Sequence, residues 1–500
     1  MSDAGDTVVV ESGSGPVQGR VENGVTVFRG VPYAAPPFGP RRFGLPQPPE
    51  PWTEVRDATS NGATAPKPAY RAVVADLLPE PEVPGEDCLH VNVWTPDLAG
   101  SAPVLVWIHG GSFQNGSNAV PVYDGHAFAR DGVVCVSVNY RLGVDGFAHL
   151  EGAPDNRGLR DQVAALEWVR DHVATFGGDP AQVTVCGESA GAMGVTTLTA
   201  MPAARGLFRG VIAQSGAGHH VLHPASATLI SAALAEQLGV EPTAEAFAAV
   251  PLDRLLAAHQ ELVTRVGADP DPAKWGEVAV NMMPFEPVVD GDSLPGVPYA
   301  EIAAGRGADV ALLVGSNDDE HALFLHPLLD AVPEDRVRLV LALLGATDGT
   351  YETLVQSLEA TSRTTRPGDV MVAGLTDWFF RLPALRLAET RLERGHDTFV
   401  YEFGWRTAAL GGVLGACHAL EIGFVFDSLA VPEGRAMVGD DAPQALADAM
   451  HGAWVRFVRD GDPGWAAYGE QRLTRRFGGH DDGTVLADPE AARREAWPDR

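Results

Sequence analysis

A serine inside a glycine-flanked pentapeptide is the strongest chemical signal in the chain. Residues 187–191 read GESAG, which matches the pattern G-x-S-x-G with Ser189 at its centre. The apolar segment 183–186 precedes the pattern and the helix-compatible segment 192–200 follows it. A strand, a sharp turn and a helix in this order hold a serine hydroxyl exposed on a strained turn, positioned to attack a carbonyl carbon. We therefore predict that Ser189 is a nucleophile.

A second glycine-containing segment has the composition of an oxyanion hole, a set of N–H donors that stabilises negative charge on a carbonyl oxygen. Residues 109–113 read HGGSF and follow the apolar segment 104–108. Glycines let backbone N–H groups approach a ligand closely and point at one position. The residue after the nucleophile, Ala190, is expected to supply a further N–H.

A serine needs a base to remove its proton and an acid to orient that base, and in this architecture the chain order is serine, acid, histidine. After the apolar segment 310–315 come three consecutive acidic residues, Asp318, Asp319 and Glu320. In an extended segment, alternation would aim Asp318 and Glu320 one way and Asp319 the other, so composition alone leaves the acid open. After segment 398–403, a glycine-containing loop leads to His418, the expected base.

These residues need a sheet to position them. Apolar, β-branched segments alternate with helical patterns, which predicts an α/β fold with a mostly parallel central sheet and flanking helices. The first 45 residues alternate apolar and polar side chains around turn signals and predict antiparallel hairpins. Helical periodicity is clearest over residues 159–176. The expected strands of the central sheet are 89–94, 104–109, 133–139, 183–186, 211–214, 310–315 and 398–403.

Two spans between expected strands are longer than a crossover requires. They are Ala/Leu-rich and helical in pattern, and we predict helical insertions at about 217–309 and 321–397 that form a cap over the active site. No flexible linker or internal repeat divides the chain, so residues 1–500 are expected to form a single domain.

Charge and composition exclude several classes of function. Thirty-six basic and 66 acidic side chains give a formal net charge of −30, which disfavours binding to nucleic acids and to anionic membranes. Four cysteines are too few for a disulfide scaffold and lack zinc-ligand spacing. With no signal-peptide pattern and no apolar run of membrane-spanning length, a cytoplasmic protein is expected.

At this point the chain resembles the type-B carboxylesterases, the cholinesterase-like branch of the α/β-hydrolases, and is close to their bacterial p-nitrobenzyl-esterase kind. The matching segments span about residues 15–465 in family order. They are FRGVPYA (28–34), EDCLHVNVW (86–94), VNYRLG (138–143), NRGLRDQ (156–162), FGGDP (176–180), QSG (214–216) and HALE (418–421).

The resemblance implies a serine carboxylesterase of α/β-hydrolase fold with Ser189 as nucleophile, Glu320 as acid and His418 as base. It places the oxyanion donors at Gly111, Ser112 and Ala190, and implies no cofactor and no metal. The chain departs from the family where Cys88 has no upstream cysteine to pair with and where His321, not glycine, follows the acid. The supporting or substrate-binding residues it implies, or that we place near the acid and base loops, are Gly110, Phe113, Glu188, Ser215, Phe324 and Phe424.

The expected partners are water and a small neutral ester with a short-to-medium acyl or aromatic group. Amides and aryl carbamates are possible further substrates, although an amine is a worse leaving group. The rival class is a non-catalytic binding protein on the same scaffold, which typically lacks the serine that this chain retains. His219, His220 and His223 suggest a metal cluster, but no carboxylate or cysteine is spaced to complete it, so a loop at the rim of the active site is favoured. The oligomeric state is left open, and a monomer is compatible with the sequence.

Overall fold

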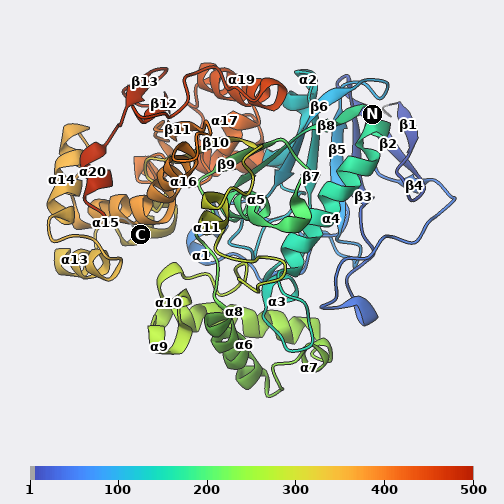
Figure 1. Ribbon diagram of the computed structural model, residues 1–500, viewed down its shortest axis with the longest axis horizontal. Helices are drawn as coiled ribbons and strands as arrows, with labels where there is room; N and C mark the ends of the chain where they lie inside the picture. The colour runs from blue at the N-terminus through green and yellow to red at the C-terminus, as the bar shows by residue number, and fades with distance from the viewer. Residues whose placement is uncertain (1–5, 499–500) are drawn as a thin grey trace.

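A single mixed sheet organises the molecule, as the computed structural model of residues 6–498 shows (Figure 1). The order of its strands is β1-β2-β3-β5-β7-β6-β8-β9-β10-β11-β12-β13, with β4 paired to β2. Strands β7, β6, β8, β9, β10, β11 and β12 run parallel to one another, whereas β1, β2, β3 and β5 form the antiparallel N-terminal part and β13 an antiparallel edge. The predicted hairpins and mostly parallel centre are confirmed.

The strands are β1 (Thr7–Glu11), β2 (Pro16–Glu22), β3 (Val25–Pro32), β4 (Arg56–Asp57), β5 (His90–Thr95), β6 (Ala102–Ile108), β7 (Val134–Val138), β8 (Gly178–Glu188), β9 (Gly210–Gln214), β10 (Ala311–Asn317), β11 (Phe399–Phe403), β12 (Leu473–Phe477) and β13 (Val485–Ala487). The α-helices are α1 (Ala72–Ala75), α2 (His126–Arg130), α3 (Gly143–Phe147), α4 (Arg157–His172), α5 (Ala190–Ala200), α6 (Pro224–Leu238), α7 (Ala244–Ala248), α8 (Leu252–Ala268), α9 (Pro272–Trp275), α10 (Val278–Asn281), α11 (Pro298–Ala303), α12 (Ala322–Leu325), α13 (Glu334–Leu343), α14 (Thr350–Ala360), α15 (Pro367–Thr376), α16 (Leu382–Leu392), α17 (Ile422–Val425), α18 (Arg435–Val438), α19 (Gln444–Asp460) and α20 (Ala491–Glu495). One π-helical turn, η6 (Asp377–Arg381), joins α15 to α16.

The parallel strands bury both faces, because successive side chains of a strand point to opposite sides of the sheet. In β6, Val104, Val106 and Ile108 pack into the apolar core that contains α4 and α5. Leu105 and Trp107 point the other way, into the core that contains α2, α17 and α19. Each strand is therefore fixed from two sides, and its carboxyl end is a rigid support for the loop that follows.

The two long spans of the chain between strands of the sheet contain helices. The first lies between β9 and β10 and contains α6 to α11, whereas the second lies between β10 and β11 and contains α12 to α16. Figure 1 shows α6, α8, α9 and α10 grouped at one side of the molecule and α13 and α14 at another edge. Among the described residues, no helix is both long enough and apolar enough to cross a bilayer.

Candidate active site

Ser189 occupies the sharp turn between β8 and α5. Its backbone angles are φ 57° and ψ −126°, a conformation that is strained for a residue with a side chain. The flanking glycines are required by close packing, because a Cβ at Gly191 would lie 2.0 Å from the carbonyl oxygen of Ile108. A Cβ at Gly187 would lie 2.5 Å from the carbonyl carbon of Gly191. The G-x-S-x-G pattern thus presses this turn against the end of β6.

The segment after β6 forms a second tight turn beside Ser189. Gly111, Ser112 and Phe113 all have positive φ, at 111°, 54° and 58°. A Cβ at Gly110 would lie 2.7 Å from the carbonyl oxygen of Glu188, so this glycine lets the two turns touch. Within the described residues, the backbone N–H groups of Gly111 and Ser112 donate to no acceptor. Ala190 is the first residue of α5, so its backbone N–H has no acceptor within the helix.

Glu320 and His418 form a buried hydrogen-bonded pair. The distance from His418 Nδ1 to Glu320 Oε2 is 2.6 Å, and the two residues are 4% and 0% exposed. The other carboxylate oxygen of Glu320 accepts from the backbone N–H of Asn317 at 2.7 Å. The backbone N–H of His418 in turn donates to the Glu320 carbonyl at 3.2 Å. The loops after β10 and β11 are thereby joined through Glu320 and His418.

The two neighbouring aspartates contact arginines instead. Asp318 pairs with Arg476, and Asp319 pairs with Arg406 and accepts from the backbone N–H of Ala416 at 2.9 Å. The expectation that Asp318 and Glu320 point the same way is wrong, because the strand ends at Asn317 and residues 318–321 form a turn.

Glu188 completes the charged groups around the imidazole. Its Oε1 lies 3.2 Å from His418 Nε2, and Ser189 makes no side-chain hydrogen bond to any described residue. Burial raises the pKa of Glu188 to about 8, although His418 opposes the shift. Burial alone would lower the pKa of His418, but Glu188 and Glu320 outweigh it and raise that pKa to about 9.

These groups meet in one cavity of about 120 Å³, which Ser189, His418 and Glu188 line together with Gly110, Gly111 and Ser112. Its apolar wall includes Tyr70, Tyr123, Val263, Met282 and Phe324. The Phe324 ring lies 5.4 Å from the His418 ring.

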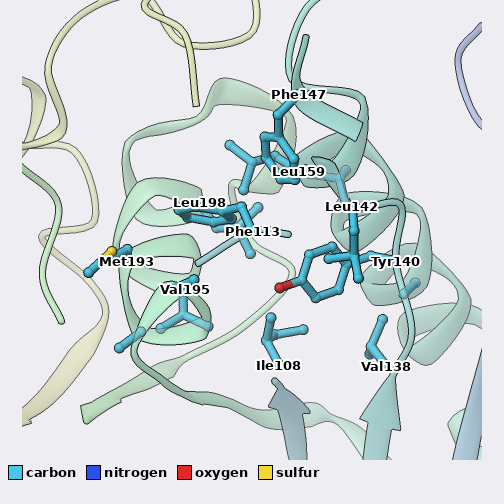
Figure 2. Packing of buried hydrophobic residues seen from close by; sticks show 14 of the residues in the cluster. Ile108, Phe113, Val138, Tyr140, Leu142, Phe147, Leu159, Met193, Val195 and Leu198 are labelled. Carbon is cyan, nitrogen blue, oxygen red and sulfur yellow. The ribbon is translucent and has the colours of Figure 1, made fainter. Parts of the chain in front are cut away.

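Three predicted supporting residues are not in this lining. The left-handed backbone of Phe113 turns its side chain into the core, where its ring lies 4.9 Å from Phe147 (Figure 2). Phe424 packs against Phe403 and Trp405, and the expectation that these two phenylalanines line the cavity is therefore wrong. Ser215 is fully buried outside the cavity, and its hydroxyl has no hydrogen-bond partner among residues 6–498.

The histidines that suggested a metal cluster lie apart from the cavity. His220, in the first insertion, stacks on Phe379 of the second with ring centroids 4.1 Å apart, whereas His223 pairs with Glu277 at the surface. His321 is partly buried, and its ring lies 5.4 Å from the Phe380 ring. Over residues 6–498, no group of three or more His, Cys, Asp or Glu side chains is arranged to hold a metal ion.

The sequence did not identify Glu80, which supports the segment that follows β6. Glu80 accepts from the backbone N–H of Gly116 at 3.1 Å and from the side-chain amide of Asn115 at 3.2 Å. No local pattern marks Glu80, since its partners lie 35 and 36 residues further along the chain.

Known proteins resemble this chain over nearly its whole length. The model of the carboxylesterase family matches residues 6–475. Para-nitrobenzyl esterase of Bacillus subtilis is 37% identical, with 97% of this chain and 98% of the relative covered. Phenmedipham hydrolase of Pseudarthrobacter oxydans is 36% identical, with 91% of this chain and 90% of the relative covered. Mouse cholinesterase is 31% identical, with 88% of this chain and 76% of the relative covered.

A solved PNB esterase superposes with a TM-score of 0.83 at 34% identity over 98% of this chain and 99% of the other. A carboxylesterase of Geobacillus stearothermophilus gives the same TM-score and identity, over 98% and 100%.

The sheet and its flanking helices are those of an α/β-hydrolase. Within that class, the chain belongs to the carboxylesterase family and is a carboxylesterase. The comparisons do not support the rival interpretation as a non-catalytic binding protein.

Proposed function

We propose that the protein hydrolyses carboxylic esters through a Ser189–His418–Glu320 triad. His418 Nε2 takes the hydroxyl proton as Ser189 Oγ bonds to the ester carbonyl carbon. Glu320 accepts from Nδ1–H, which fixes the tautomer and stabilises the imidazolium. The carbonyl oxygen becomes an oxyanion that accepts from the N–H groups of Gly111, Ser112 and Ala190.

Collapse of the tetrahedral intermediate breaks the bond to the alcohol oxygen, which receives the proton held by His418. Water then attacks the acyl-enzyme and loses its proton to the same imidazole. The second collapse frees the carboxylic acid and returns the proton to Ser189.

One observation carries this proposal: the serine turn, two free N–H groups and the Glu320–His418 pair converge on one cavity. His418 Nε2 lies 3.2 Å from Glu188 Oε1, and we propose that it accepts from Ser189 Oγ when an ester is bound. Catalytic hydrogen bonds are often long before substrate binds.

We propose neutral esters with short-to-medium acyl or aromatic groups as substrates. The small cavity and its aromatic walls support this class. Aryl carbamates are a second class, because one relative is named for hydrolysis of phenmedipham. A carbamate presents the same carbonyl geometry to Ser189 and the N–H donors.

A series of p-nitrophenyl esters from two to 16 carbons tests the substrate class. We expect the highest kcat/KM at short-to-medium chains and a stoichiometric burst of p-nitrophenol, which Ser189→Ala abolishes. A maximum at 16 carbons would indicate a lipase, and an undiminished Ser189→Ala variant would refute the triad.

A further inference from the structure

The turn that carries two of the proposed oxyanion donors is strained. Ser112 and Phe113 are consecutive non-glycine residues with φ of 54° and 58°. A left-handed conformation is unfavourable for residues with a Cβ, and it persists only where surrounding contacts hold it. The contacts around this turn therefore decide where the N–H groups of Gly111 and Ser112 point.

A side chain from the first insertion makes such a contact. His259, on α8, places Nε2 2.7 Å from Gln114 Oε1, and both side chains are buried. An amide oxygen only accepts, so Nε2 carries the hydrogen in this bond. The backbone N–H of Gln114 donates to the Gly111 carbonyl at 2.9 Å, which connects the bond directly to the turn.

His259 is itself tightly fixed. Its ring meets Phe285 edge to face, with centroids 4.5 Å apart. A Cβ at Gly143 would lie 2.5 Å from His259 Cε1, so the ring rests on the Gly143 backbone. The N–H of Gly143 donates to the Phe113 carbonyl at 2.7 Å. His259 thus braces the turn twice, through Gln114 and through the backbone that holds Phe113.

The same helix faces the substrate cavity. Gln260 and Val263 of α8 line it, whereas His259 does not. Burial lowers the pKa of His259 to about 3, so the imidazole stays neutral and keeps one N–H to donate.

We propose that His259 is a positioning residue, whose hydrogen bond to Gln114 holds the strained 111–113 turn with its N–H groups aimed at the oxyanion. This rests on the oxyanion hole proposed above. The insertion therefore shapes the transition-state site as well as the cavity wall.

The test compares His259→Leu, which removes the donor, with His259→Gln, whose amide N–H can replace it. For p-nitrophenyl butyrate we expect His259→Leu to lower kcat by about 10- to 100-fold, with KM changed less than about threefold, because a displaced donor acts in the transition state. Inhibition by a trifluoromethyl ketone, whose serine adduct carries an oxyanion, should weaken in parallel with kcat/KM. His259→Gln should restore most of both.

Leu262→Ala is the matched control, since Leu262 is a buried residue of α8 outside the cavity lining. It should lower the melting temperature and leave kcat and ketone affinity within about twofold. If His259→Leu does not fold, Gln114→Leu removes the same bond from the other side. Unchanged kcat in either variant, or a His259→Gln variant as impaired as His259→Leu, would overturn the proposal. A wild-type enzyme that the ketone does not inhibit would instead refute the serine mechanism itself.

Discussion

Glu320 differs from its two acidic neighbours by what it contacts. It alone of the three reaches His418 Nδ1, whereas Asp318 and Asp319 are held by arginines. We expect Glu320→Gln to lower kcat by several orders of magnitude, because the amide cannot stabilise the imidazolium as a carboxylate does. Asp318→Asn should lower the melting temperature and keep most of the turnover. The opposite pattern in steady-state kinetics would make Asp318 the acid.

Glu188 contributes to the pH dependence of kcat/KM through the pKa of His418. The pKa of His418 is raised to about 9, and only the neutral imidazole accepts the serine proton, so activity is lost as pH falls below that pKa. The acidic limb of kcat/KM should therefore lie above the ordinary histidine value of about 6.5. Glu188→Gln removes a charge that raises this pKa, so the limb should move to lower pH. A limb that stays in place or moves upward in this variant would contradict the assigned cause.

At the scale of residues, the sequence identifies site residues only where their contacts lie close in the chain or follow a short motif. Ser189 lies in a pattern whose glycines are needed for contacts within a few residues or with β6. The residues alone left the acid open, because alternation fails once β10 ends at Asn317. Contacts such as Gln114 with His259 join distant segments and leave no mark in either one.

At the scale of elements, the close approach of β6 to the start of α5 holds the site together. A Cβ at Gly191 would press into the Ile108 carbonyl, so Gly191→Ala should destabilise the fold by about 3 kcal/mol and abolish activity. Gly452→Ala, in α19 with open space around it, should stabilise by about 0.5–1 kcal/mol. Urea unfolding of both variants measures this difference. A Gly191→Ala variant as stable as the wild type would mean that the two elements are not constrained at this point.

The central strands and α4 could be predicted from their periodicity, whereas β12 and β13 could not. Residues Leu473–Phe477 read LTRRF, and Arg476 in this strand is held by the carboxylates of Asp318 and Glu402. Ion pairs, and not an apolar side chain, therefore hold this position of β12 against its neighbours. A search for alternating hydrophobic residues does not detect such a strand. The positive φ of Phe113 and the ring contacts of Phe424 with Phe403 and Trp405 are likewise not visible in the sequence, so their side chains could not be placed from it.

At the scale of the whole molecule, the net charge produces an electrostatic field that acts on charged substrates. Its net charge of −30 repels anions. An ester that bears a carboxylate should therefore show a lower kcat/KM than a neutral ester of similar size at low salt. The gap should narrow as salt screens the field. Equal rates that do not respond to ionic strength would show that the field does not reach the substrate.

The most direct test of the central claim is the site of covalent labelling by an organophosphate, which forms a stable bond to an activated serine oxygen. Mass spectrometry of the digested protein should find one adduct, on Ser189, with a stoichiometry that follows the loss of esterase activity. The Ser189→Ala variant should remain unlabelled. An adduct on another residue that tracks inactivation, or complete inhibition without any adduct on Ser189, would contradict the account.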